Sequence, residues 1–183
     1  MILKPCDIVF TRSSGFLGRM IRFFTRRKGE SKTITSHVGI ITYGSDLWNS
    51  TIVEAQTHTN RHSMQEAYGS SDTELCIFRP KNLTNEQVEK IVAKAESYVG
   101  DDYGYLKLLA YAADWCLGER NVFRRLCRID SRPICSYLVA RSYEAAGLDF
   151  GVDDYAASPD DILDFCTGNP DKYVFVWQRG NMI

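Results

Sequence analysis

The sequence predicts one domain of the α+β class. The predicted strands cluster near the two ends of the chain and most of the predicted helices lie between them, which is not the alternating order of a parallel α/β sheet. The 183 residues can bury a core, and 44% hydrophobic against 25% charged residues is an ordinary globular composition. The sequence shows no repeats or linkers, so we expect a single domain over residues 1–183.

The first half of the chain is rich in strand patterns. "DIVF" predicts a strand at 7–10, and "GFLGRMIRFFTRR" predicts a helix at 15–27 with an apolar side and several arginines. β-Branched residues predict strands at 36–42 and 51–56, which the turn-like "YGSDLWNS" joins as a pair. A further strand is expected at 75–80, where "LCIFRP" ends at a proline.

The second half is mainly helical. The helix pattern is clearest at 83–100, where Thr84 or Asn85 can cap the start and Gly100 ends the helix. Its apolar stripe is expected to consist of Val88, Ile91, Val92, Ala95 and Val99. Residues 104–128 also predict helix, interrupted near Gly118.

Two more helices and a closing strand complete the prediction. One helix begins near Cys135, two residues after Pro133, and stops at Gly147. In "SPDDILDFC", Ser158 is expected to cap the next helix and Pro159 to take its first position. "KYVFVWQ" at 172–178 predicts the last strand.

Cys135 raises the question of chemistry, because it lies at the expected first turn of a helix. Free N–H groups and the positive end of the helix dipole both favour a thiolate there. The alternative is a small buried hydrophobe, as most free cysteines are. A catalytic thiol needs a base, and the chain offers only His37, His58 and His62.

A histidine and a glutamate on the two paired strands are candidates to complete the site. Alternation places His37, Gly39 and Ile41 on one face of their strand, and Gly39 leaves bare backbone that a ring or a substrate can approach. Glu54 can meet His37 if the two are opposite or two residues apart along the same face. A satisfied core histidine and an outward-facing glutamate are the alternatives.

Two other polar groups compete for roles. Gln56 shares the face of Glu54 and is an alternative orienting residue. His58 and His62 are four apart, a spacing that can hold a metal on a helix, but no further ligand pattern supports one, and we expect neither metal nor cofactor.

With these residues in view, the chain resembles the circularly permuted papain-like hydrolases of the YiiX/YebB type, relatives of NlpC-type peptidases and lecithin:retinol acyltransferase-like proteins. The similarity rests on "CDIVFTRSSGFLGRMIRFFT", "SHVGI", "TIVEA", "YVGDDYGYLKLL", "ICSYLVARSYEAAGLDF" and "SPDDIL", in that order over most of the chain. His37 precedes Cys135, which is the permuted order.

The resemblance implies a permuted papain-like fold, with an antiparallel sheet or partly open barrel packed against the nucleophile helix and further helices. It implies Cys135 as nucleophile, His37 as base, Glu54 as third member and Tyr103 beside the nucleophile in substrate binding. Residues 112–134 look longer and more basic than such a protein needs, and we interpret them as a lid or substrate wall. The Ser-Tyr pair after Cys135 also departs from the usual pattern.

The leading hypothesis is a cysteine hydrolase that cleaves an amide or peptide bond in a cell-wall peptide-like substrate through an acyl-thioenzyme. A lipid acyltransferase or thioesterase on the same scaffold, and a non-catalytic binding module, are the alternatives. The net charge of −1 gives no attraction to nucleic acid, and the arginines of 120–132 lack a reading motif. For residues 15–27, packing onto the domain is a simpler explanation of the apolar side than membrane contact.

Cysteine usage and the N-terminal residues bear on location. The six cysteines lack the spacing of a disulfide framework, and neither a signal peptide nor an apolar spanning run is visible. We therefore expect reduced thiols and a cytoplasmic protein, with release by another route as the alternative.

Overall fold

The computed structural model describes residues 1–12, 34–102, 134–155 and 157–183. The predicted helices at 15–27 and 104–128, the proposed lid at 112–134 up to residue 133, and Tyr103 lie outside these ranges.

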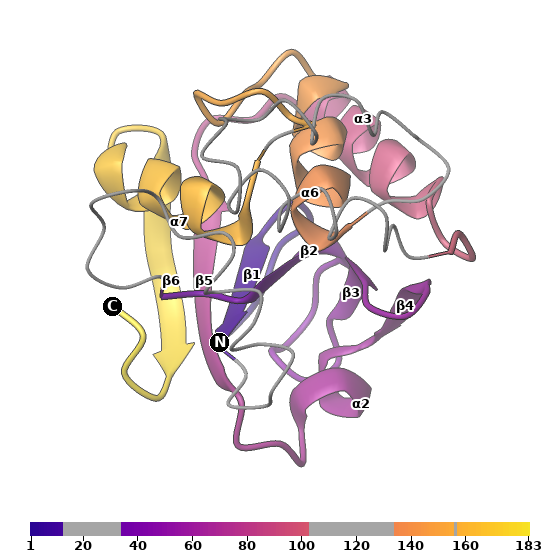
Figure 1. Ribbon diagram of the computed structural model, residues 1–183, viewed down its shortest axis with the longest axis vertical. Helices are drawn as coiled ribbons and strands as arrows, with labels where there is room; N and C mark the ends of the chain where they lie inside the picture. Colours follow the sequence, from indigo (N-terminus) through magenta and orange to yellow (C-terminus); the bar gives the residue numbers. More distant parts are fainter. Residues whose placement is uncertain (13–33, 103–133, 156) are drawn as a thin grey trace, which may run out of the picture.

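An antiparallel sheet forms the centre of the described structure (Figure 1), as predicted. Six strands pair in the order β4-β3-β2-β1-β5-β6. Their bounds are β1 Ile8–Arg12, β2 His37–Tyr43, β3 Thr51–Ala55, β4 Thr59–Ser63, β5 Glu74–Pro80 and β6 Tyr173–Arg179. The five strands that the sequence predicted are all present, with ends shifted by one or two residues.

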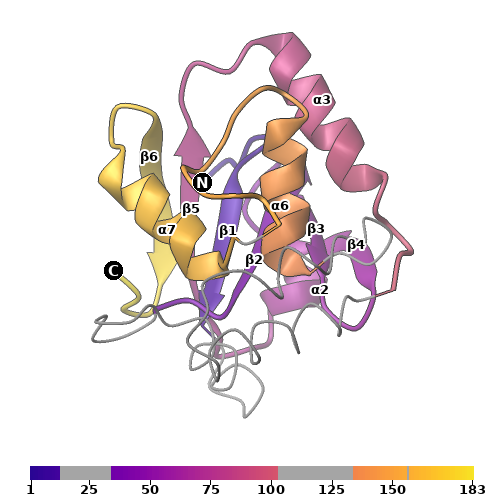
Figure 2. The same ribbon diagram turned by 45° about the horizontal axis from the view of Figure 1, so that its top comes forward.

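Three helices cover one face of this sheet (Figures 1 and 2): α3 Asn85–Glu96, α6 Cys135–Glu144 and α7 Pro159–Gly168. Helices α3 and α6 lie side by side, α6 packs on β2, and α7 packs near β6. The short helix α2, Met64–Tyr68, belongs to the opposite face. Among the described helices, none is long and apolar enough to cross a membrane.

Alternation along the strands divides the apolar side chains between two cores. On β2, Val38 and Ile40 face the core beneath α3, α6 and α7, while Ile41 faces the core that includes α2. Both faces of the central strands are therefore buried, which explains their near-continuous apolar sequence. The α+β class follows from this sheet with helices on its faces.

Helix ends follow the local signals. Thr84 caps α3 and Ser158 caps α7, each in a reciprocal capping box, and Pro159 takes the first position of α7. Gly147 follows α6 with a φ of +75°, a conformation that glycine adopts without strain. The expected place of Val99 in the apolar stripe was wrong, because α3 ends at Glu96 and Val99 is 39% exposed.

The sequence did not predict β4 and α2. The segment "TNRHS" of β4 carries polar side chains and no apolar alternation, yet it pairs with β3 residue by residue from Thr51 to Ala55. His62 is in β4 and His58 directly precedes it, so the two histidines are not on a helix. In extended chain, residues four apart lie about 13 Å apart, too far to share a metal ion.

Candidate active site

The pairing of β2 with β3 brings His37 and Glu54 to the same face of the sheet. Ile40 pairs with Val53 and Ile41 with Ile52, so the register continues with Gly39 opposite Glu54. His37 then lies two residues from that position along the same face, one of the two arrangements that the sequence allowed.

Gly39 makes this approach possible. A Cβ atom on Gly39 would lie 2.8 Å from Cδ1 of Ile52 and 3.1 Å from Cβ of Glu54. The missing side chain leaves room for the Glu54 side chain above β2. The space over Gly39 is thus filled by Ile52 and Glu54, and the expectation that a substrate could approach there was wrong.

Glu54 is a buried carboxylate surrounded by donors. It is fully buried, and its Oε2 lies 2.7 Å from Nε2 of His37 and accepts a hydrogen bond from the Tyr68 hydroxyl. Its Oε1 lies 2.7 Å from Nε2 of His62 and accepts from Nε2 of Gln56 at 2.9 Å. Four donors fill the four lone-pair directions of an ionised carboxylate.

These contacts set the protonation states of Glu54 and His37. Burial raises the pKa of Glu54, but the charge of His37 and hydrogen bonds from His37, His62 and Tyr68 outweigh it and hold that pKa well below its ordinary value. The carboxylate is therefore ionised over the physiological range. Because it can only accept, Nε2 of His37 carries the proton and Nδ1 is left as the basic nitrogen.

Cys135 is the first residue of α6 and lies beside His37. Burial lowers the pKa of His37, but the charge of Cys135 and a hydrogen bond with it, together with the same two interactions with Glu54, raise that pKa to about 10. His37 is thus held in its charged form beside a thiol. The structure thus brings together Cys135, His37 and Glu54.

The start of α6 offers groups that favour negative charge. Ile134 is the cap residue and gives no side-chain hydrogen bond, and the first turn contains no acidic residue. The first N–H groups of a helix lack partners within the helix, and the helix dipole adds positive potential there. A thiolate or an oxyanion at Cys135 is stabilised by both.

Sequence reasoning missed Tyr68 and underrated His62. Tyr68 is buried on α2, a helix of only five residues, too short to show a helical period. His62 reaches Glu54 because Ile52 pairs with His62, which places the histidine two residues from Glu54 along the same face. Gln56 was the alternative to Glu54 as the residue that orients the histidine, and in the structure it donates a hydrogen bond to Glu54.

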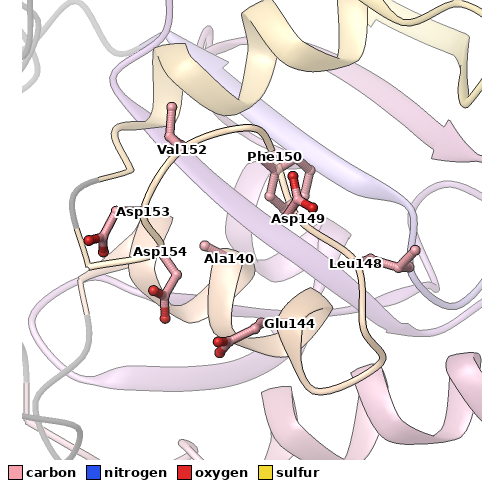
Figure 3. A pocket seen from close by; sticks show the side chains of 8 residues that line it. All are labelled: Ala140, Glu144, Leu148, Asp149, Phe150, Val152, Asp153 and Asp154. Carbon is pink, nitrogen blue, oxygen red and sulfur yellow. The ribbon is translucent and has the colours of Figure 1, made fainter.

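A hollow in the described surface lies elsewhere, at the C-terminal half of α6 and the loop after it (Figure 3). Carboxylates line much of it: Glu144, Asp149, Asp153 and Asp154. Arg141 forms ion pairs with two of them, Asp154 at 3.0 Å and Glu144. None of Cys135, His37 and Glu54 lines this hollow.

Comparison with solved structures shows the fold. The chain is similar to the crystal structure of metalloprotein yiiX from Escherichia coli O157:H7, described as DUF1105, with a TM-score of 0.55 and 17% identity. The match covers 81% of this chain and 69% of that chain. No protein-family model matches the sequence, and no curated protein matches it either. The resemblance to the YiiX type, first seen in short motifs, is therefore confirmed at the level of the fold.

Proposed function

We propose that the protein is a cysteine hydrolase that cleaves an amide or peptide bond. The observation that carries the proposal is the contact of His37 with both Cys135 and Glu54, at the uncapped start of a helix. Nucleophile, base and orienting acid in this order are the parts of a thiol hydrolase. The yiiX-like fold supports the same class, and a cell-wall peptide-like substrate is what the resemblance implies.

The reaction has two halves. The Cys135 thiolate attacks the carbonyl carbon, and the N–H of Cys135 stabilises the oxyanion that forms. The His37 imidazolium gives its proton to the departing amine, leaving a thioester between the acyl group and Cys135. His37 then takes a proton from water, the hydroxide attacks the thioester, and the carboxylic acid and the thiolate–imidazolium pair are released. Glu54 keeps its charge throughout and holds the ring.

The role of Tyr103 in substrate binding is a proposal that rests on the resemblance alone.

A metal ion is a separate question, because the yiiX protein is described as a metalloprotein. Within the part of this chain that the structure describes, no three His, Cys, Asp or Glu side chains are grouped to hold a metal ion. We therefore derive no step through a metal.

The first test needs no substrate. The alkylation rate of each cysteine is measured by mass spectrometry between pH 5 and 9 in the wild type and in His37→Ala. We expect Cys135 alone to react well below pH ~7 and to lose this advantage without His37. Burial raises the pKa of Cys6 and of Cys76 to about 12, so these thiols serve as internal references.

His58→Ala is the matched control, since His58 is exposed and pairs with Asp102. If Cys135 titrates like an ordinary thiol in the wild type, the hydrolase proposal fails and a binding module becomes the leading hypothesis. If it is activated, peptide amides and acyl thioesters are screened with the wild type and Cys135→Ala. Products carrying the acyl group on an amine or alcohol, instead of a free acid, would identify an acyltransferase.

A further inference from the structure

Glu54 is shared between two histidines that approach it from opposite sides. Strand β3 lies between β2 and β4 (Figure 1), and both neighbours place a histidine two residues from Glu54 on the same face. His37 takes Oε2 at 2.7 Å and His62 takes Oε1 at 2.7 Å. The catalytic scheme above uses only the first of these contacts.

We propose that His62 is a positioning residue of the Cys135 site, which fixes the Glu54 carboxylate when neutral and competes with His37 for its charge when protonated. The inference rests on the proposed function and deepens it by adding a pH-dependent control. The carboxylate is fully buried, so its orientation depends on the side chains that donate to it. His62 and Gln56 hold Oε1, which leaves Oε2 directed at His37 and Tyr68.

The charged and titratable groups that act on His62 come from three elements. Within the described residues they are Glu54 from β3, Glu66 from α2 and His37 from β2. The hydrogen bond with Glu54 raises the pKa of His62 above its ordinary value, while burial and the charge of His37 act in the opposite direction. His62 is also 22% exposed at its side chain, so solvent protons reach it.

Protonation of His62 therefore weakens the neighbouring pair. Neutral His62 donates one hydrogen bond and leaves the full carboxylate charge to stabilise the His37 imidazolium. Protonated His62 neutralises part of that charge and repels His37, so a proton on one ring disfavours a proton on the other. The proposed hydrolase should have its strongest thiolate–imidazolium pair above the pH at which His62 loses its proton.

The primary experiment measures this coupling by NMR titration of the histidine rings. The chain has three histidines, which variants assign. In Cys135→Ala, where the thiol no longer affects His37, we expect coupled titration of His37 and His62. The ring that titrates at the lower pH gains its proton beside a ring that is already charged. Replacing its partner histidine with Gln, which keeps a neutral donor, should therefore raise the pKa of that ring by roughly 1 unit. His58→Gln, the control, should leave both values unchanged.

The positioning role is tested by the rate of Cys135 alkylation at about pH 8 in the chain with its thiol. We expect His62→Ala to lower the rate three- to tenfold and His62→Gln to restore most of it, corresponding to one hydrogen bond lost and regained. The proposal is overturned if His62→Ala reacts like the wild type, or if the titration of neither His37 nor His62 responds to replacement of the other by Gln.

The two proposals fail in different ways. If Cys135 of the wild type is activated by His37 but ignores His62, the hydrolase proposal stands and this one falls. If Cys135 is not activated at all, the proposed function itself fails. Should the His62 variants not fold, Cys135→Ala alone decides the matter, since independent single-step titration of both rings contradicts the coupling.

Discussion

Replacing Glu54 with glutamine tests the centre of the proposed site with a change of almost no volume. Glutamine has one carbonyl oxygen and one NH2 group, whereas all four neighbours of Glu54 donate to it. Whichever way the amide turns, its NH2 meets two donors. The substitution therefore removes a negative charge and leaves at least one buried contact unmade.

The magnitude follows from the His37 contact. Hydrogen bonds to charged groups contribute about 1.5–3 kcal/mol, which corresponds to roughly one to two units in the pKa of His37. We expect the alkylation rate of Cys135 near pH 6 to fall about 10- to 100-fold in Glu54→Gln. The free energy of unfolding at pH 7 should fall by about 3–5 kcal/mol, as for other broken buried charge pairs.

Alkylation with mass spectrometric readout and urea denaturation measure the two effects. Glu86→Gln is the control, because Glu86 is 74% exposed and pairs with Lys90 on the surface of α3, and it should change neither. A folded Glu54→Gln variant whose Cys135 reacts within about threefold of the wild type would refute the role of Glu54.

A milder substitution covers the case in which Glu54→Gln does not fold. Tyr68→Phe removes one donor and keeps the carboxylate, so Glu54 has more charge available for His37. We expect the free energy of unfolding to fall by about 1–2 kcal/mol while the alkylation of Cys135 is maintained or increased. A strong decrease would show that His37 depends on Tyr68 rather than on the charge of Glu54.

Three further predictions concern packing and pH. Gly39→Ala places a Cβ against Ile52 and Glu54, so the free energy of unfolding should fall by about 1–3 kcal/mol and Cys135 should react more slowly; unchanged values in both assays would contradict the packing. The hydroxyl of Ser136 is buried without a hydrogen-bond partner among the described residues, so Ser136→Ala should leave stability unchanged or raise it by up to ~1 kcal/mol in urea denaturation. A larger loss would mean that the hydroxyl is bonded. Burial lowers the pKa of His37, but contacts with Cys135 and Glu54 raise it from 6.5 to about 10. In the proposed pair the proton that His37 keeps is the one that the Cys135 thiol gives up, so folding changes the number of bound protons little between pH 6.5 and 8.5. The free energy of unfolding of the wild type should therefore be nearly constant over this range, and a steep fall would argue against the thiolate–imidazolium pair.

The sequence carried enough information for one half of the site. The β-branched residues of "SHVGIIT" and "TIVEAQ", with a short turn between them, predicted a pair of neighbouring strands in which His37 and Glu54 could meet on one face, and the observed register brings them together. Capping residues likewise located the starts of α3 and α7. These features depend on neighbours in the sequence, so a single sequence shows them.

The other half depends on contacts that leave no local pattern. Strand β4 is polar, and it forms because its backbone pairs with β3, which already has a buried partner on its other side. His62 and Tyr68 reach Glu54 only through that pairing and through the turn into α2. Periodicity cannot detect such residues, since their role is set by register and not by spacing.

The burial of Glu54 is itself an argument for function. Desolvating a carboxylate costs several kcal/mol, and well-packed apolar residues commonly replace buried ion pairs without loss of stability. A sheet already closed by Ile41 and Ile52 on the same face has no need of a charge for packing. The carboxylate is explained if its purpose is to keep His37 protonated on Nε2 and basic on Nδ1 beside Cys135. On this reasoning the stability lost in Glu54→Gln comes from donors left without an acceptor, and replacing Glu54 together with its partners by apolar residues should restore stability while abolishing the activation of Cys135.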